Sequence, residues 1–166
     1  MTDPPLSIDA SELRAYLSLI EVSSLLRHAV EQQLRDAGDL SYVQFQLLAR
    51  LGDSPTGSHR MTDLADGVVY SRSGLTYQAQ VLEERGLVTR APSVDDDRGT
   101  TVTIAAPGRD LLTRVFPGHI ALLRELLLAP LTAADVEVLA DVLTRVRDHM
   151  RAAPPRSATR RRRAAP

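Results

Sequence analysis

The chain has 166 residues, with 20 arginines, no lysine, 21 acidic residues and no cysteine. This length and the 43% apolar content fit one domain with tails and a real core. The absence of cysteine excludes a disulfide framework, a thiol nucleophile, a zinc-thiolate finger and an iron-sulfur cluster, and it fits a reducing, intracellular setting.

Charge is distributed unevenly along the chain. Residues 151–166 hold six arginines and no acid, so residues 1–150 carry 14 arginines against 21 acids, a balance of −7. The N-terminus lacks the features of a signal peptide, and no run of about 20 apolar residues occurs, so we expect a soluble, cytoplasmic protein. The segment 151–166 has no apolar periodicity and is predicted to be disordered; Arg160–Arg163 either track DNA or form a solvated end without a specific role.

The first half of the chain predicts three helices. Residues 1–10 contain two prolines and are expected to form a flexible arm. Apolar residues at three- and four-residue steps predict a helix over about 11–36, roughly 40 Å long, which is more than a compact core needs, so part of it should pack on a partner. Ser41 can cap a second helix, which leads into a turn-rich loop over 52–58. Thr62 is the expected cap of a short third helix that Gly67 stops.

The fourth predicted helix has an apolar side and a side of uncharged polar residues. Ser71 can cap it, and Gly86 terminates it. Its apolar residues Leu75, Ala79 and Leu82 lie on one side, while a polar stripe on another side consists of Ser73, Thr76, Tyr77 and Gln80. Two β-rich runs, 87–90 and 100–104, then flank a polar tip at 95–99 and predict a hairpin.

The last part of the chain is helical and rich in leucine and valine. Pro117 and Gly118 should kink or interrupt a fifth helix that starts near Gly108. Thr132 and Asp135 resemble a capping box that opens a sixth helix ending near Met150. The apolar density of these helices exceeds what a small core can bury, which predicts a dimer.

The element order over residues 62–104 is that of a winged helix-turn-helix, whose second helix enters the DNA major groove. The predicted fold class is therefore mainly α with a small β-hairpin wing. One domain over 11–150 would contain a winged helix-turn-helix at about 41–104 and dimerisation helices at about 11–36 and 108–150. The polar stripe could be merely solvated, but its hydroxyl, phenol and amide groups suit base edges, and Gln80 can pair bidentately with adenine. Arg72 is an expected phosphate or base contact, and Arg98 an expected minor-groove contact.

Residues 11–150 resemble transcriptional regulators of the multiple-antibiotic-resistance (MarR) family. The resemblance lies in the element order, in the helix from Ser71 to Arg85 followed by Gly-Leu-Val, and in the wing sequence Asp96-Asp97-Arg98 before a β-strand. It implies that Asp96 stabilises the wing and that Arg98 contacts DNA. Two features depart from the family. Ile104-Ala105 replaces the usual Leu-Thr, which removes the expected cap of the fifth helix, and three consecutive aspartates make the wing tip acidic, which should weaken its DNA binding.

The resemblance further implies a homodimer that binds a pseudo-palindromic operator in double-stranded DNA and represses transcription until a small, often aromatic, acid releases it. The candidate ligand-binding residues are His28, Tyr42, Phe45, Phe116 and His119. Each of them could instead be an ordinary core or surface residue with no role in binding. The competing hypothesis is a winged-helix dimer that binds a ligand or a protein and lacks operator recognition. No catalytic motif is present, and four dispersed histidines argue against a metal site, so we expect neither an enzyme nor a cofactor.

Overall fold

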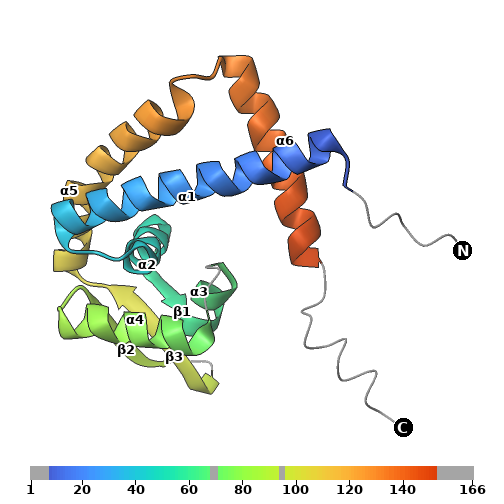
Figure 1. Cartoon of the computed structure of the whole chain (residues 1–166). Helices are drawn as coiled ribbons and strands as arrows, with labels where there is room; N and C mark the ends of the chain where they lie inside the picture. Colours follow the sequence, from blue (N-terminus) through green and yellow to red (C-terminus); the bar gives the residue numbers. More distant parts are fainter. Residues whose placement is uncertain (1–7, 68–70, 94–95, 153–166) are drawn as a thin grey trace, which may run out of the picture. The chain divides into compact units, whose positions relative to one another are not determined.

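The computed structural model describes residues 8–67, 71–93 and 96–152, and the chain divides into two compact units, residues 1–123 and 124–166. The first unit contains α1 (Ala10–Gly38), α2 (Tyr42–Asp53), β1 (Ser58–Arg60), α3 (Met61–Gly67), α4 (Arg72–Glu84), β2 (Val88–Ser93), β3 (Asp96–Ile104) and α5 (Ala106–Leu123) (Figure 1). The second contains a π-helix, η1 (Arg124–Leu128), and α6 (Ala133–Ala152). The predicted arm and tail fall mostly on 1–7 and 153–166, which lie outside the described residues.

Helix α1 is bounded by two local signals. At its start Asp9 accepts from the backbone N–H of Glu12 at 2.9 Å, and the Glu12 carboxylate accepts from the N–H of Asp9, which makes a capping box. At its end Asp39 adopts a left-handed conformation with φ 50°. Gly38 comes just before this turn because α5 passes close by: a Cβ there would lie 2.8 Å from Cγ2 of Val115.

A short strand that the sequence did not predict lies between the second and third helices. Ser41 caps α2 as expected, accepting from the N–H of Gln44 at 3.2 Å. The loop predicted over 52–58 gives way at Ser58 to strand β1, which is too short to show an alternating pattern. Helix α3 begins at Met61, so the prediction of Thr62 as its cap is wrong; Thr62 lies in the first turn and donates to Asp63.

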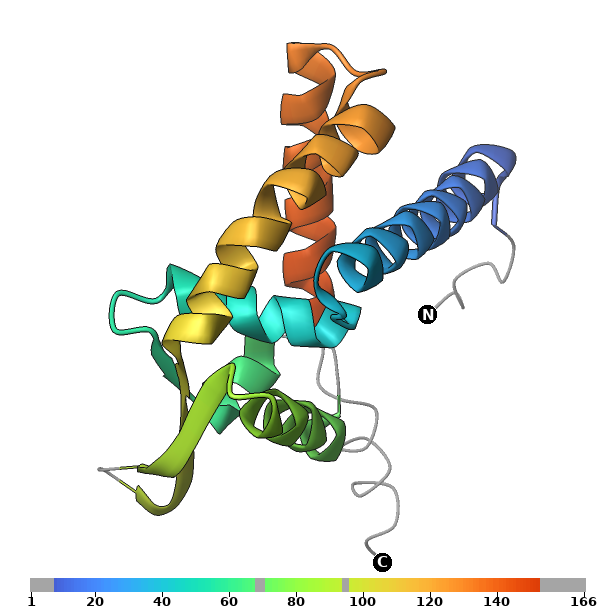
Figure 2. The same cartoon turned by 90° about the vertical axis from the view of Figure 1, so that its left-hand side faces the viewer.

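The wing is part of a three-stranded antiparallel sheet with the order β1-β3-β2. Val88 pairs with Ile104, and Ser58 pairs with Thr103 on the other side of β3. The strands are longer than predicted, since β2 reaches Ser93 and β3 already begins at Asp96, with a register shift at Pro92/Ser93. The β2–β3 hairpin projects from the rest of its unit (Figure 2).

The core of the first unit lies where the helices meet the sheet. Apolar side chains from every helix of this unit and from β2 and β3 form one buried cluster, which includes Leu34, Leu48, Leu64, Leu75, Leu82, Val88, Val102, Leu111 and Val115. At about 25 cal/mol for each Å² of apolar surface removed from water, this cluster supplies the main stabilisation of the unit and fixes α4 from behind. The predicted fold class, mainly α with a small β wing, is confirmed.

Two predictions about the last helices have different outcomes. Of the kink or interruption expected at Pro117, the interruption is wrong, because α5 continues through this residue to Leu123. Pro117 and Thr113 are both exposed, so the carbonyl that loses its helical N–H partner can be hydrated. In the second unit the predicted capping box is confirmed: Thr132 N–H donates to Asp135 at 2.9 Å, and Asp135 N–H donates to Thr132 at 3.2 Å.

Candidate nucleic-acid interface

Helix α4 has one buried side and one exposed side. Leu75, Ala79 and Leu82 are each 0% exposed. The polar stripe predicted from the sequence lies on the opposite side, where Ser73, Thr76 and Gln80 are exposed and Tyr77 is 62% exposed. The Tyr77 ring adds an aromatic surface to the hydrogen-bonding groups of this face, so the face is suited to binding a polar, planar partner.

The N-terminus of α4 is fixed by Ser71. Its side-chain oxygen accepts from the N–H of Gly74 at 3.2 Å, as predicted for an N-cap, and its hydroxyl hydrogen is left to donate. The remaining backbone N–H groups of the first turn, together with the helix dipole, favour an anion at this end. The other predicted contacts, Arg72, Asp96 and Arg98, have side chains that lie outside the described part of the structure.

Gln80 is oriented by a neighbour on the same helix. Its Nε2 donates to a carboxylate oxygen of Glu84 at 3.1 Å. This bond uses one of the two Nε2 hydrogens of a side chain at an exposed position, so the amide keeps one hydrogen to donate and Oε1 to accept. One donor and one acceptor are what bidentate pairing with adenine requires.

The C-terminal end of α4 is attached to two other elements. Arg85 donates to the backbone oxygens of Asp39 at 2.7 Å and Gly38 at 3.2 Å, which satisfies carbonyls at the end of α1. Glu83 accepts from both the backbone N–H of Arg90 at 3.0 Å and its guanidinium at 2.7 Å. These hydrogen bonds from Arg90 lower the pKa of the Glu83 carboxyl. Helix α4 is thus tied to α1 and to the wing.

The middle of α4 is held by a contact that the sequence analysis missed. Gln44 of α2 is 8% exposed, and its Nε2 donates to Oε1 of Gln78 at 2.9 Å. A signal for Gln44 was present, because Ser41 and Gln44 have the spacing of a capping box. Nothing in the sequence indicates Gln78 as its partner, since that pairing depends on how α2 crosses α4.

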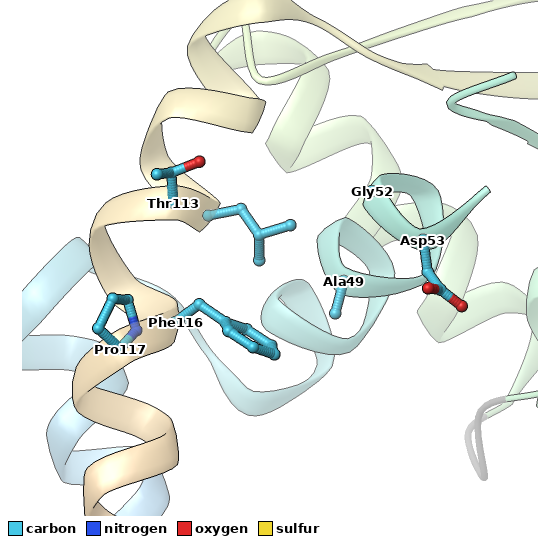
Figure 3. Close-up of a pocket in the computed structure, with 7 residues that line it drawn as sticks. Ala49, Gly52, Asp53, Thr113, Phe116 and Pro117 are labelled. Carbon is cyan, nitrogen blue, oxygen red and sulfur yellow. The ribbon is translucent and has the colours of Figure 1, made fainter. Parts of the chain in front are cut away.

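Four of the five predicted ligand-binding residues lie close together, and His28 lies apart from them. Tyr42 and His119 line one cleft of about 410 Å³ together with Ser23, Leu26, Arg27, Val30 and Leu123. Phe45 is buried behind it, with its ring 4.6 Å from that of His119. The ring centre of Phe116 lies 6.5 Å from that of Phe45 and 6.4 Å from that of His119. Phe116 also lines a neighbouring hollow, where Figure 3 shows its ring reaching toward Ala49 on α2. His28 is exposed and lies at a third depression with Gln32 and Leu122.

The cleft beside Tyr42 has a distinctive chemistry. The Arg27 guanidinium lies 5.2 Å from the centre of the Tyr42 ring and pairs with Glu31 at 3.0 Å. Nδ1 of His119 is buried, and among the described residues it has no hydrogen-bond partner. Burial lowers the pKa of His119, so the imidazole is neutral near pH 7 and its nitrogens can exchange hydrogen bonds with an incoming group.

In the part of the chain that the structure describes, histidine, aspartate and glutamate side chains form no group of three that could hold a metal ion. Within the described ranges, no helix is both long and apolar enough to cross a membrane.

A helix-turn-helix whose second helix exposes a polar stripe, followed by a β-hairpin, defines the class of winged-helix DNA-binding proteins. Residues 38–99 match the sequence model described as "MarR family". The fold is similar to that of Sco3205, a MarR family transcriptional regulator of Streptomyces coelicolor solved in complex with DNA, with 30% identity, a TM-score of 0.84 and coverage of 89% of this chain and 92% of that one. The chain belongs to the MarR family of transcriptional regulators.

Two similar proteins come from Bacillus subtilis (strain 168). The transcriptional regulator MhqR is 27% identical over 146 residues, which cover 88% of this chain and 93% of MhqR. The transcriptional repressor YetL is 28% identical over 113 residues, which cover 68% of this chain and 67% of YetL. These relatives are regulators of transcription, which supports a DNA-binding regulator.

Proposed function

We propose that this protein is a transcriptional repressor that binds a pseudo-palindromic operator as a homodimer in the cytoplasm, with α4 in the major groove. The observation that carries the proposal is the exposed polar stripe of α4 set directly opposite three fully buried apolar residues. The DNA-bound structure of Sco3205 and the repressor YetL support it by relationship. Because packing of the buried side of α4 already fixes the helix, its polar groups can contact bases with little further loss of conformational entropy on binding.

The expected contacts divide into two kinds. Ser73, Thr76, Tyr77 and Gln80 would meet base edges, and Gln80 would pair with adenine through its free Nε2 hydrogen and Oε1. Ser71 and Arg72 would position the helix on phosphates, Arg98 would contact DNA from the wing, and Asp96 would stabilise the wing. The roles of Arg72, Asp96 and Arg98 rest on the sequence and the family resemblance.

Exposed apolar side chains support the homodimer. The first two thirds of α1 expose Leu13, Tyr16, Leu17 and Ile20, each 42–57% exposed, along one stripe of the helix. In the second unit, α6 has no buried residue and exposes Val138, Val142, Val146 and Met150. Surfaces of this kind are costly in water, and a second copy is the simplest partner that would cover them.

The cleft beside Tyr42 is the best supported effector site. Arg27 offers a cation, Tyr42 and His119 offer ring faces, and Nδ1 of His119 offers an unused buried hydrogen-bonding atom. This set suits a small aromatic acid. Binding there would favour a spacing of the two α4 helices that no longer fits successive major grooves, which would release the operator.

The proposal is tested with double-stranded DNA from the regions flanking the gene for this protein. The full chain and a variant lacking residues 156–166 are titrated against these fragments and against a scrambled DNA of equal length, at about 50 and 200 mM salt. We expect a footprint with two half-sites about 10 bp apart, retained without the tail but weaker, and with a smaller salt dependence. Equal affinity for all fragments would instead favour a winged-helix dimer without operator recognition.

A further inference from the structure

The contact between α2 and α4 is directional at one point. Most of it is apolar, through side chains such as Leu48, Leu75 and Ala79. Apolar contacts resist separation of the helices, but they tolerate small rotations and slides because they have no preferred angle. The hydrogen bond from Gln44 to Gln78, at 2.9 Å, is the directional part.

The orientation of the Gln44 amide is fixed by the start of its own helix. Its Oε1 accepts from the backbone N–H of Ser41 at 3.1 Å. A backbone N–H can only donate, so the atom facing Ser41 must be the oxygen, and Nε2 must face α4. Gln78 is then obliged to present its own oxygen to Gln44.

This chain of bonds joins the first turn of α2 to the middle of the proposed recognition helix. Gln78 lies directly after Tyr77 and two residues before Gln80, both on the polar stripe. Successive residues of a helix are turned by about 100° around its axis. Fixing the direction of Gln78 therefore also fixes the direction in which the stripe faces. Loss of this bond would leave the apolar contacts of α4 in place and would allow only a small rotation of the helix, which shifts the stripe relative to the bases.

We propose that Gln44 is a positioning residue for DNA recognition: through its hydrogen bond to Gln78 it fixes the rotation of α4 and so the aim of the residues that read bases. This role rests on the proposed function of α4 as the recognition helix. Gln44 itself is buried and touches no base.

Three substitutions on α2 test the role. In Gln44→Met the new side chain has a similar volume to glutamine, and both hydrogen bonds of the Gln44 amide are lost. Gln44→Glu can still accept from Ser41 N–H with one oxygen, and the other oxygen can accept from Gln78 once that amide turns, so it should restore the link; glutamate is also favoured at this place in a capping box. Gln46→Met, on the same helix at a half-buried position, is the matched control.

The readout is the ratio of affinities for the selected operator and for scrambled DNA, measured where circular dichroism shows every variant folded. Gln44→Met should lower this ratio about tenfold or more, because a misaligned stripe would lose about one hydrogen bond to a base in each half-site, while affinity for scrambled DNA stays unchanged. Gln44→Glu and Gln46→Met should keep the ratio of the natural protein. Gln78→Met, which removes the partner from the less buried side, should reproduce the loss.

Each contrary result has a distinct meaning. A lower melting temperature with an unchanged ratio in Gln44→Met would show that Gln44 is only structural. An equal loss in Gln44→Met and Gln44→Glu would show that the hydrogen bond is not the cause. Either result overturns the positioning role and leaves the proposed function intact, whereas a ratio near one in the natural protein would overturn both.

Discussion

The two ends of α1 bury their apolar residues differently. Val30 and Leu34, near its C-terminus, are 3% and 0% exposed, because they belong to the core shared with α2 and α5. Leu17 and Ile20, near its N-terminus, are 54% and 50% exposed although they repeat at the same helical spacing. The winged-helix part of the chain therefore completes its own core, and the first part of α1 requires a second surface, which the proposed dimer would provide.

The largest effect is expected in the self-contained core. Leu82→Ala removes a fully buried side chain from the rear of α4 and should destabilise the protein by about 2–5 kcal/mol, measured by urea unfolding. Thr89→Ala, at an exposed position of β2, is the control and should change stability far less. A loss below about 1 kcal/mol for Leu82→Ala would mean that this core is loosely packed.

A change on the exposed part of α1 should act on association and leave folding of the winged helix intact. Leu17→Glu places a charge in the proposed interface and should weaken dimerisation by about 2 kcal/mol or more, seen as a shift to monomer in sedimentation equilibrium. Ser18→Glu adds the same charge one residue further on, away from the stripe of Leu13, Tyr16, Leu17 and Ile20, and should leave the dimer intact. Unchanged association in Leu17→Glu would contradict the assignment of this stripe.

The smallest effect concerns pH and the link between α4 and the wing. Arg90 lowers the pKa of Glu83, so this carboxylate stabilises the fold above its ordinary pKa of about 4.3 and loses that contribution as pH falls through the folded-state value. Glu83→Gln should therefore show a shallower fall in melting temperature between about pH 5 and pH 3 than the natural protein. Part of the fall should remain, because Asp9 and Asp135 also have lowered pKa values through hydrogen bonds at helix starts. Identical curves for the two proteins would show that the Arg90 contact does not form in solution.

Much of the fold was predictable because its signals are local. The caps at Ser41 and Ser71, the capping box at Thr132 and the two sides of α4 all follow from residues within one or two helical turns. Strand β1 was missed because tertiary structure decides it: this segment is a strand only where β3 pairs with it. Sequence left a kink or an interruption open at Pro117, and α5 runs through it without interruption.

The candidate sites show the same division. The exposed stripe of α4 follows from helical periodicity alone and lies where it was expected. The predicted ligand-binding set had no such periodicity to guide it. Phe45, Phe116 and His119 contact one another and Tyr42 shares a cleft with His119, whereas His28 lies at a separate depression. Gln44 and Gln78 were missed because residues 34 positions apart meet only once α2 crosses α4.

The central claim is that the exposed face of α4 reads base sequence. It is tested most directly by selecting bound sequences from a randomised DNA library with the natural protein, with Gln80→Ala and with Arg98→Ala. We predict that Gln80→Ala relaxes the preference at one base pair in each half-site, and that Arg98→Ala weakens binding to many sequences about equally without changing the selected motif. An unchanged motif with Gln80→Ala would contradict this orientation of α4.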